Sequence, residues 1–460
     1  MKNMYSILYG LGYCVCCLLM TSCYGDFLEI EPNRKLAVPT TLKDLDALMD
    51  NTTLLNANAL LIMGEIGTDD YYLNETDWNS LTNPYQKNGY VWAKDIYEGQ
   101  QCPGWNNAYQ KILYANLVLE SITKLERNHQ NEVQWNRIKG TALFWRAWQF
   151  FQLAQIFCDD YQKGSANQKM GIPIRLASDI NQQNTRATIE DTYRQIVQDL
   201  TEAGDLLPAM AGEKTRPSKQ ATYALLARTY LQMKEYALAK QQAEKCLSIS
   251  DVLISYSEVN SNLNFPFPLY ARGNTEQPLL DAMIRTQTFA SFLKIDTTLL
   301  RSYEAGDLRV ATYFSVSNGY YVFKGTYNGY ATYNPFPALD EVYLIRAECN
   351  ERMGNHDDAL KDLNQLLIHR YQKGAYQAKT MENTKNILTE ILNERRKSLI
   401  FRGVRWSDLR RLRTEAAYAK TIVRVLGNKR YELSPEQEHL YTWPIPDNVI
   451  NLGGIAQNVR

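Results

Sequence analysis

The sequence predicts a mainly helical protein, in which helical pairs form a tetratricopeptide-like scaffold and an irregular, loop- and hairpin-rich subdomain is inserted. Apolar residues recur at helical spacing along most of the chain, two segments repeat one small-residue pattern, and two long segments rich in glycine, proline and tyrosine interrupt the helices. The predicted helical pairs span about 105–158, 188–249, 338–370 and 387–413, and the irregular aromatic segments span about 63–104 and 251–337.

The two repeated segments are residues 217–249 and 340–370. In tetratricopeptide repeats, small residues occupy the positions where paired helices touch. Two alanines fall at these positions in each copy with the same spacing, namely Ala227 and Ala239, then Ala347 and Ala359. The copies are far apart along the chain, so they do not form a regular solenoid in which units follow one another directly.

The start of the chain carries the pattern of an export signal. Lys2 precedes a mostly uncharged run, residues 7–20, which ends in Met20-Thr21-Ser22-Cys23. The run is too short to span a bilayer, and small residues precede the cysteine. Because this ending resembles the lipobox of bacterial lipoproteins, we predict a lipoprotein signal peptide over residues 1–22 and lipidation of Cys23. The alternative is ordinary signal cleavage that leaves Cys23 as a free thiol.

Composition excludes several classes of partner. The chain has 50 basic and 50 acidic residues, and this balance argues against a nucleic-acid partner and against binding to anionic lipid by charge alone. No second apolar run approaches the length of a transmembrane helix. The four histidines are isolated, and the cysteines after Cys23 show no metal-binding spacing. We therefore predict no metal, no cofactor and no disulfide framework.

Catalytic motifs give no support for an enzyme. Three pairs of adjacent aspartates occur, but neighbouring side chains diverge and do not form the facing carboxylates that glycoside hydrolysis needs. The sequence has no nucleophile elbow, phosphate-binding loop or zinc-protease motif. We predict that the protein is not an enzyme. A hydrolase stays the minor alternative, because catalytic residues can come from distant segments.

Aromatic residues favour a binding function. The chain has 31 tyrosines, and many lie in the two irregular segments. Flat rings can cover the apolar faces of sugars and also suit extended peptides, and loops carry function more often than regular elements do. Most rings are expected to be structural. The ligand-binding candidates are Trp78, Trp92, Tyr97, Tyr327 and Tyr330.

An arginine-rich segment follows near the C-terminus, within residues 394–413. A basic run of this kind can bind anions. We favour a structural interpretation, in which the arginines form buried or half-buried bidentate pairs with Glu394 and Asp408 and hold helix to helix. The extended tail after it is expected to pack across the body of the protein with Trp443 as its anchor.

The cysteine leader, the interrupted helical pairs, residues 394–411 and the ending Trp443-Pro444-Ile445-Pro446 together resemble the SusD/RagB family of Bacteroidetes outer-membrane lipoproteins. The resemblance runs from Cys23 to Val459 and implies a single SusD-like domain over residues 23–460. Acidic residues often stand in the family at the positions of Ser398 and Arg402, so the resemblance also implies a different salt-bridge arrangement there.

This resemblance implies a cell-surface nutrient-binding protein without enzymatic activity. Such a protein delivers oligosaccharides to a SusC-like TonB-dependent transporter in the outer membrane and contacts the membrane only through its lipid. In the family the helical pairs mainly face the transporter, and the irregular segments build the ligand surface. RagB-like peptide uptake and a scaffold that binds no ligand are the alternatives, and the sequence does not choose the ligand.

Overall fold

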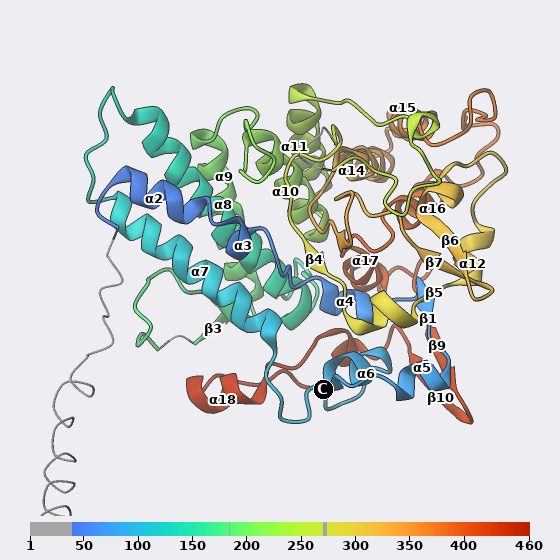
Figure 1. Ribbon diagram of the computed structural model, residues 1–460, viewed down its shortest axis with the longest axis horizontal. Helices are drawn as coiled ribbons and strands as arrows, with labels where there is room; N and C mark the ends of the chain where they lie inside the picture. Colours follow the sequence, from blue (N-terminus) through green and yellow to red (C-terminus); the bar gives the residue numbers. More distant parts are fainter. Residues whose placement is uncertain (1–38, 184, 270–273) are drawn as a thin grey trace, which may run out of the picture. The chain divides into compact units, whose positions relative to one another are not determined.

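Antiparallel helices pair along the chain as the periodicity predicts (Figure 1). The computed structural model describes residues 39–183, 185–269 and 274–460, so Cys23 and the predicted signal peptide lie outside the described residues. Residues 41–460 form one compact unit. The helices of eight or more residues are α2 (Leu42–Met49), α7 (Pro103–Ile122), α8 (Glu132–Phe157), α9 (Ile189–Leu206), α10 (Lys219–Gln232), α11 (Tyr236–Ile249), α14 (Leu339–Arg352), α15 (His356–Leu367), α16 (Ile387–Ser398) and α17 (Arg405–Leu412).

The two tetratricopeptide-like pairs, α10 with α11 and α14 with α15, are neighbours in space although they are distant in sequence. Helix α11 packs against α14, and Figure 1 shows α10, α11 and α14 side by side. Ala227, Ala239, Ala347 and Ala359 are all fully buried in one hydrophobic cluster, because small side chains let the helices approach closely. The predicted mainly helical, tetratricopeptide-like fold class is confirmed.

The remaining long helices continue this scaffold. Helix α8 packs between α7 and α9, and α9 packs in turn against α10. Trp145 and Trp148 of α8 are completely buried, as expected for tryptophans at helical spacing. Helix α9 begins where its sequence predicts, since the Thr188 side chain accepts a hydrogen bond from the backbone N–H of Asp191.

The two irregular segments contain only short elements, and two-stranded sheets connect them. Strand β1 (Tyr71–Tyr72) of the first segment pairs antiparallel with β5 (Lys294–Ile295) of the second. Within the second segment, β4 (Met283–Ile284) pairs with β8 (Thr332–Tyr333), and β6 (Phe314–Ser317) forms a hairpin with β7 (Tyr320–Phe323). The other short elements there are α3 (Thr52–Leu55), α4 (Ile62–Ile66), α5 (Glu75–Asn79), α6 (Pro84–Tyr90), η1 (Tyr256–Glu258), η3 (Thr288–Phe292), α12 (Thr297–Arg301) and α13 (Arg309–Tyr313).

The C-terminal part holds elements that the sequence analysis did not predict, namely the short helices η4 (Glu438–Tyr441) and α18 (Asp447–Gly453) and the hairpin of β9 (Ile422–Leu426) and β10 (Lys429–Leu433). The tail behaves as predicted: Trp443 is 2% exposed, and its backbone N–H donates to the carbonyl of Ile156 on α8. Elsewhere the described elements are β2 (Met170–Pro173) and β3 (Arg186–Thr188).

Four cysteines lie in the described residues, and all four are free and buried: Cys102, Cys158, Cys246 and Cys349. Burial raises the pKa of the Cys102 thiol to about 11, so the side chain is an uncharged hydrophobic group near neutral pH. Among the helices that the structure describes, none combines the length and the apolar character that crossing a membrane requires.

Candidate ligand-binding site

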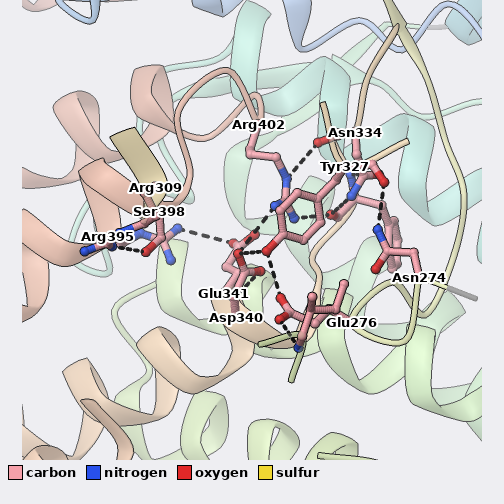
Figure 2. Close-up of polar contacts among 12 residues, drawn as sticks. Asn274, Glu276, Arg309, Tyr327, Asn334, Asp340, Glu341, Arg395, Ser398 and Arg402 are labelled. Carbon is pink, nitrogen blue, oxygen red and sulfur yellow. Dashed lines mark hydrogen bonds and ion pairs between the residues drawn. The ribbon is translucent and has the colours of Figure 1, made fainter. Parts of the chain in front are cut away.

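A buried polar network holds the second irregular segment on the helical scaffold (Figure 2). The Tyr327 hydroxyl lies 2.8 Å from a carboxylate oxygen of Glu276 and 3.0 Å from one of Asp340 on α14. The guanidinium of Arg402 covers the face of the same ring at 4.2 Å from its centroid, and the guanidinium of Arg370 is 2.9 Å from Glu276. Ring stacking and charged hydrogen bonds of this kind are strong when water is excluded. The network therefore fixes the position of residues near 327.

The arginine-rich segment forms buried ion pairs, which confirms the structural interpretation. Arg395 donates to Asp408 over 2.8 Å, and Arg411 binds Glu348 of α14 in a bidentate pair of 2.5 and 2.8 Å. Glu394 lies 2.7 Å from Arg309, which comes from the inserted segment. The segment thus connects α14, α16, α17 and the insertion through charges.

The charges of these partners control the acidity of the buried carboxyl groups. Burial alone would raise the pKa of Glu348, but the positive charges of Arg411 and Arg352 outweigh burial and hold the pKa below its usual value. The same balance, with Arg395 and Arg411 as the cations, lowers the pKa of Asp408. Both carboxylates therefore stay ionised inside the protein.

The resemblance implied a different salt-bridge arrangement at Ser398 and Arg402, and the structure shows the partners of both. The Ser398 hydroxyl accepts a hydrogen bond of 2.8 Å from Arg309. Arg402 donates to the carbonyl of Asn334 over 3.0 Å and lies 3.5 Å from Asp340. The carboxylates near these two arginines come from other positions, Glu394 for Arg309 and Asp340 for Arg402.

A cleft of about 220 Å³ opens where the two irregular segments meet beside the start of α7. We call it the Arg285 cleft. Its lining residues are Asn58, Ala59, Leu60, Ile62, Met63, Tyr85, Cys102, Pro103, Gly104, Asn107, Ile284, Arg285 and Thr286. The volume is below the range of about 300–1,000 Å³ typical of pockets that enclose a whole small ligand, so the cleft suits one residue of a longer polymer.

Local contacts explain why this cleft is where it is. The backbone N–H of Ala59 donates to Ala282, one residue before β4, over 3.0 Å. The Gln86 side chain accepts two hydrogen bonds of 3.0 Å from Thr288, which joins α6 to η3. Gly104 lets α7 approach closely, because a Cβ atom there would lie 2.5 Å from the Leu60 side chain.

Arg285 supplies the charge of the cleft. Its guanidinium carbon lies 5.1 Å from the ring centroid of Tyr333 and 5.9 Å from that of Phe265. Its Nε and Nη2 atoms are withdrawn from solvent and have no hydrogen-bond partner in the described residues, and the same holds for Oγ1 of Thr286. The cleft is therefore cationic and has unused hydrogen-bonding groups in its wall.

Tyr330 adds an exposed ring beside the cleft. It is 62% exposed, and its ring centroid lies 6.0 Å from that of Phe265, which also borders Arg285. The turn that carries it is firmly held, because the Asn328 side chain donates to the carbonyls of Asp281 and Tyr333. Because these hydrogen bonds already fix the turn, the Tyr330 ring is presented to solvent. The protein then loses little conformational freedom when a ligand binds to this ring.

The five aromatic candidates separate into two groups. Trp92, Tyr97 and Tyr327 are at most 3% exposed, so protein atoms already cover their rings: Trp92 donates to Gly67, Tyr97 to Pro444, and Tyr327 belongs to the network described above. Trp78 is half-buried, donates to the carbonyl of Lys87 and carries the Lys87 ammonium at 4.9 Å from its ring centroid. Tyr330 is the most exposed candidate; it does not line the Arg285 cleft itself but contacts Phe265, which packs on Arg285.

Sequence reasoning did not single out Arg285, Phe265 or Tyr85, which join Tyr330 at this site. Tyr85 shares the aromatic signal of the first irregular segment. Arg285 stands in a short run without periodicity or motif, so no local pattern marks it. Only the pairing of β4 with β8 places it beside Tyr330.

A larger cleft of about 650 Å³ lies between α7 and α18. Its lining combines apolar side chains such as Leu113 and Val449 with many amides, including Asn106, Gln110 and Asn448. Trp105 and Tyr109 of its wall pack against each other at 4.9 Å between ring centroids. This second cleft also carries one cation, Arg175, as the first carries Arg285, but no ring as exposed as Tyr330 belongs to its lining.

Comparisons with known proteins agree with this architecture. A SusD-like family model, described as starch-binding associating with outer membrane, matches residues 26–231, and a SusD family model matches residues 315–459. A tetratricopeptide-repeat model matches residues 221–252. No curated protein sequence matches the chain.

Solved structures show the same fold over nearly the whole chain. A SusD superfamily protein from Bacteroides thetaiotaomicron is 21% identical, with a TM-score of 0.72 over 91% of this chain and 100% of that one. A SusD-like carbohydrate binding protein from Bacteroides vulgatus is 19% identical, with a TM-score of 0.67 over 90% and 97%. Surface glycan-binding protein A from Bacteroides fluxus is 16% identical, with a TM-score of 0.63 over 91% and 99%.

The two SusD models together match more than half of the chain, and their boundaries include both the first irregular segment and the arginine-rich segment. The helical scaffold and the position of the insertion between the tetratricopeptide-like pairs agree with these matches. This protein therefore belongs to the SusD/RagB family.

Proposed function

We propose that this protein is a cell-surface lipoprotein that binds oligosaccharides and delivers them to a SusC-like TonB-dependent transporter in the outer membrane. The observation that carries the proposal is the exposed Tyr330 ring beside the Arg285 cleft, at the junction of the two irregular segments. An exposed ring next to polar groups is the arrangement that sugars need, since a sugar has an apolar face and a rim of hydroxyl groups.

The family comparisons support this ligand class. One structural relative is described as carbohydrate binding and another as glycan binding, and the family model refers to starch and the outer membrane. The function is binding without turnover. Lipid on Cys23 is the membrane anchor, and the protein faces the cell exterior, where it meets polymers that are too large to cross the membrane.

Affinity electrophoresis through gels that contain one polysaccharide each tests the proposal. The parent should be retarded by at least one glycan, and Tyr330→Ala should weaken that retardation, because loss of a stacked ring costs about 0.5–1.5 kcal/mol. Tyr321→Ala is the matched control, since Tyr321 is 42% exposed on the β6–β7 hairpin, whereas Tyr330 is the ring that contacts Phe265 next to Arg285.

Four outcomes would contradict the proposal. Equal retardation of the parent and Tyr330→Ala in every gel that retards the parent would exclude this site. Binding of peptides and of no glycan would favour the RagB-like alternative. Copurification with a barrel transporter without binding of either ligand class would favour a scaffold, and release of products from a bound polymer would indicate a hydrolase.

A further inference from the structure

Arg285 is a cation without an anion. The structure gives it two aromatic neighbours, Tyr333 and Phe265, and no ion pair or hydrogen bond within the described ranges 39–183, 185–269 and 274–460. The buried arginines of the described residues have polar partners: Arg228 pairs with Glu341 and Arg411 with Glu348. Arg410 and Arg424 donate to backbone carbonyls instead. Arg285 differs from these arginines because its guanidinium forms no ion pair or hydrogen bond with the described residues.

Leaving such a charge uncompensated is unfavourable. A guanidinium that loses water without gaining hydrogen bonds pays for desolvation, and ring faces compensate only part of this loss. The wall beside it adds a second unused group, the hydroxyl of Thr286, which is buried and has no partner in the described residues. Neither group has a partner as a paired residue does, and both residues line the cleft, so a rotation of their side chains presents these groups to a ligand.

The position of Arg285 suits a ligand that already contacts Tyr330. Phe265 lies between them, 6.0 Å from the Tyr330 ring centroid and 5.9 Å from the Arg285 guanidinium carbon. A polymer whose one sugar stacks on Tyr330 can therefore place a neighbouring sugar in the Arg285 cleft. A carboxylate on that sugar would meet the planar donor edge of a guanidinium, which is the geometry that arginine binds best.

We propose that Arg285 selects acidic glycans by binding the carboxylate of a uronic acid residue in the cleft. This inference rests on the proposed glycan-binding function and narrows it to one substrate class. The contribution of a charge-assisted pair predicts an affinity about ten- to hundredfold higher for the acid than for the neutral form of the same polymer. High salt should reduce this preference, because it screens the attraction.

The test uses isothermal titration of the parent with uronic acid oligosaccharides derived from polygalacturonate, alginate and heparosan. Each is paired with its carboxyl-reduced form, which keeps the linkage and removes the charge. We expect tight binding of at least one acidic oligosaccharide and weak binding of its reduced counterpart. Arg285→Gln should remove the preference, so that both forms bind with the weak affinity of the reduced one.

Two further variants separate charge from fold. Arg285→Lys keeps the charge without the planar donor pair and should retain part of the preference. Arg301→Gln, an exposed arginine on α12 outside the cleft lining, should bind as the parent does. A thermal melt of each variant checks folding, and Arg285→Gln should melt at or above the temperature of the parent, because it removes an uncompensated charge.

The outcomes distinguish this inference from the proposed function. Equal binding of acidic and reduced forms, or an unchanged preference in Arg285→Gln, overturns the role of Arg285 and leaves glycan binding intact. Binding of neutral glycans with no acidic one bound also overturns it. If no glycan of either kind is bound, both proposals fail, and binding of peptides through Arg285 would then reassign the charge to a peptide carboxylate.

Discussion

The guanidinium of Arg402 lies 4.2 Å from the ring centroid of Tyr327, and the hydroxyl of that ring reaches both Glu276 and Asp340. Arg402 follows α16, Tyr327 belongs to the insertion, and Asp340 opens α14, so one aromatic ring connects three parts of the fold. Tyr330, the exposed ring of the candidate site, stands three positions after Tyr327 in the sequence. The contacts that hold Tyr327 on the scaffold therefore also hold the turn that carries Tyr330.

Tyr327→Phe tests this connection. The variant keeps the ring under Arg402. It removes the hydroxyl that donates a hydrogen bond to the carboxylates of Glu276 and Asp340, so these buried oxygens lose a donor. We expect a loss of about 1–3 kcal/mol in the free energy of unfolding, measured by urea denaturation. Tyr321→Phe, which removes a hydroxyl from an exposed ring, should change stability by less than about 0.5 kcal/mol. Similar losses in both variants would show that the network carries no special stability.

Glu348 gives a prediction about pH. In the folded state Arg411 and Arg352 lower the pKa of this carboxyl group. The ionised group therefore stabilises the fold at pH values above its pKa in the unfolded chain. This contribution is lost as the pH falls through its lower pKa in the folded protein. At neutral pH, Glu348→Gln should lose about 3–5 kcal/mol, because it breaks a buried pair. The difference between parent and variant should shrink as the pH falls below about 4.5, the usual pKa at which the unfolded chain takes up a proton. It should be lost once the pH lies below the lowered pKa of the folded carboxylate. A difference that stays constant from neutral to acidic pH would contradict this assignment.

A comparison of alanine variants at Gly403 and Gly354 separates the cost of backbone strain from that of steric crowding. Its φ is +73°, and a Cβ atom there would lie 2.8 Å from that of Leu61, next to the cleft wall. Gly354 has a similar φ of +82° with open space around it. Both alanine variants should lose about 1–2 kcal/mol for the left-handed backbone. Gly403→Ala should lose about 1–3 kcal/mol more by overpacking. Equal melting temperatures of the two variants would exclude the steric contribution.

Cys23→Ala tests the proposed anchor. If lipid on Cys23 is the membrane attachment, the variant should leave the membrane fraction and appear as a folded, ligand-competent protein in the soluble fraction. Fractionation followed by affinity electrophoresis measures both properties. A variant that stays in the membrane fraction would refute the lipid anchor, and a released variant that does not fold would show that Cys23 has a structural role.

Local patterns predicted those parts of the fold that depend on neighbours along the chain. Apolar spacing located α7 to α11 and α14 to α17, and the side chain of Thr188 marked the start of α9. The β9–β10 hairpin also had a local signal that the sequence analysis did not use. Gly427 and Asn428 stand between two alternating strands, and this is a typical two-residue hairpin turn.

The sequence by itself determined the helical scaffold and the family, because periodicity and motifs act over a few residues. It also indicated that the arginine-rich segment forms ion pairs, but the tertiary structure supplied most of the partners, since Arg405 pairs with Asp69 and Arg411 with Glu348. Only the tertiary structure decided which aromatic rings reach solvent. Tyr97 is buried because its hydroxyl meets Pro444, and Trp92 is buried beneath the guanidinium of Arg424, which lies 4.8 Å from its ring. Burial depends on partners hundreds of residues away. For the same reason no local pattern could show that Arg285 and Tyr330 share the neighbour Phe265, or that Arg285 has no anionic partner among the described residues.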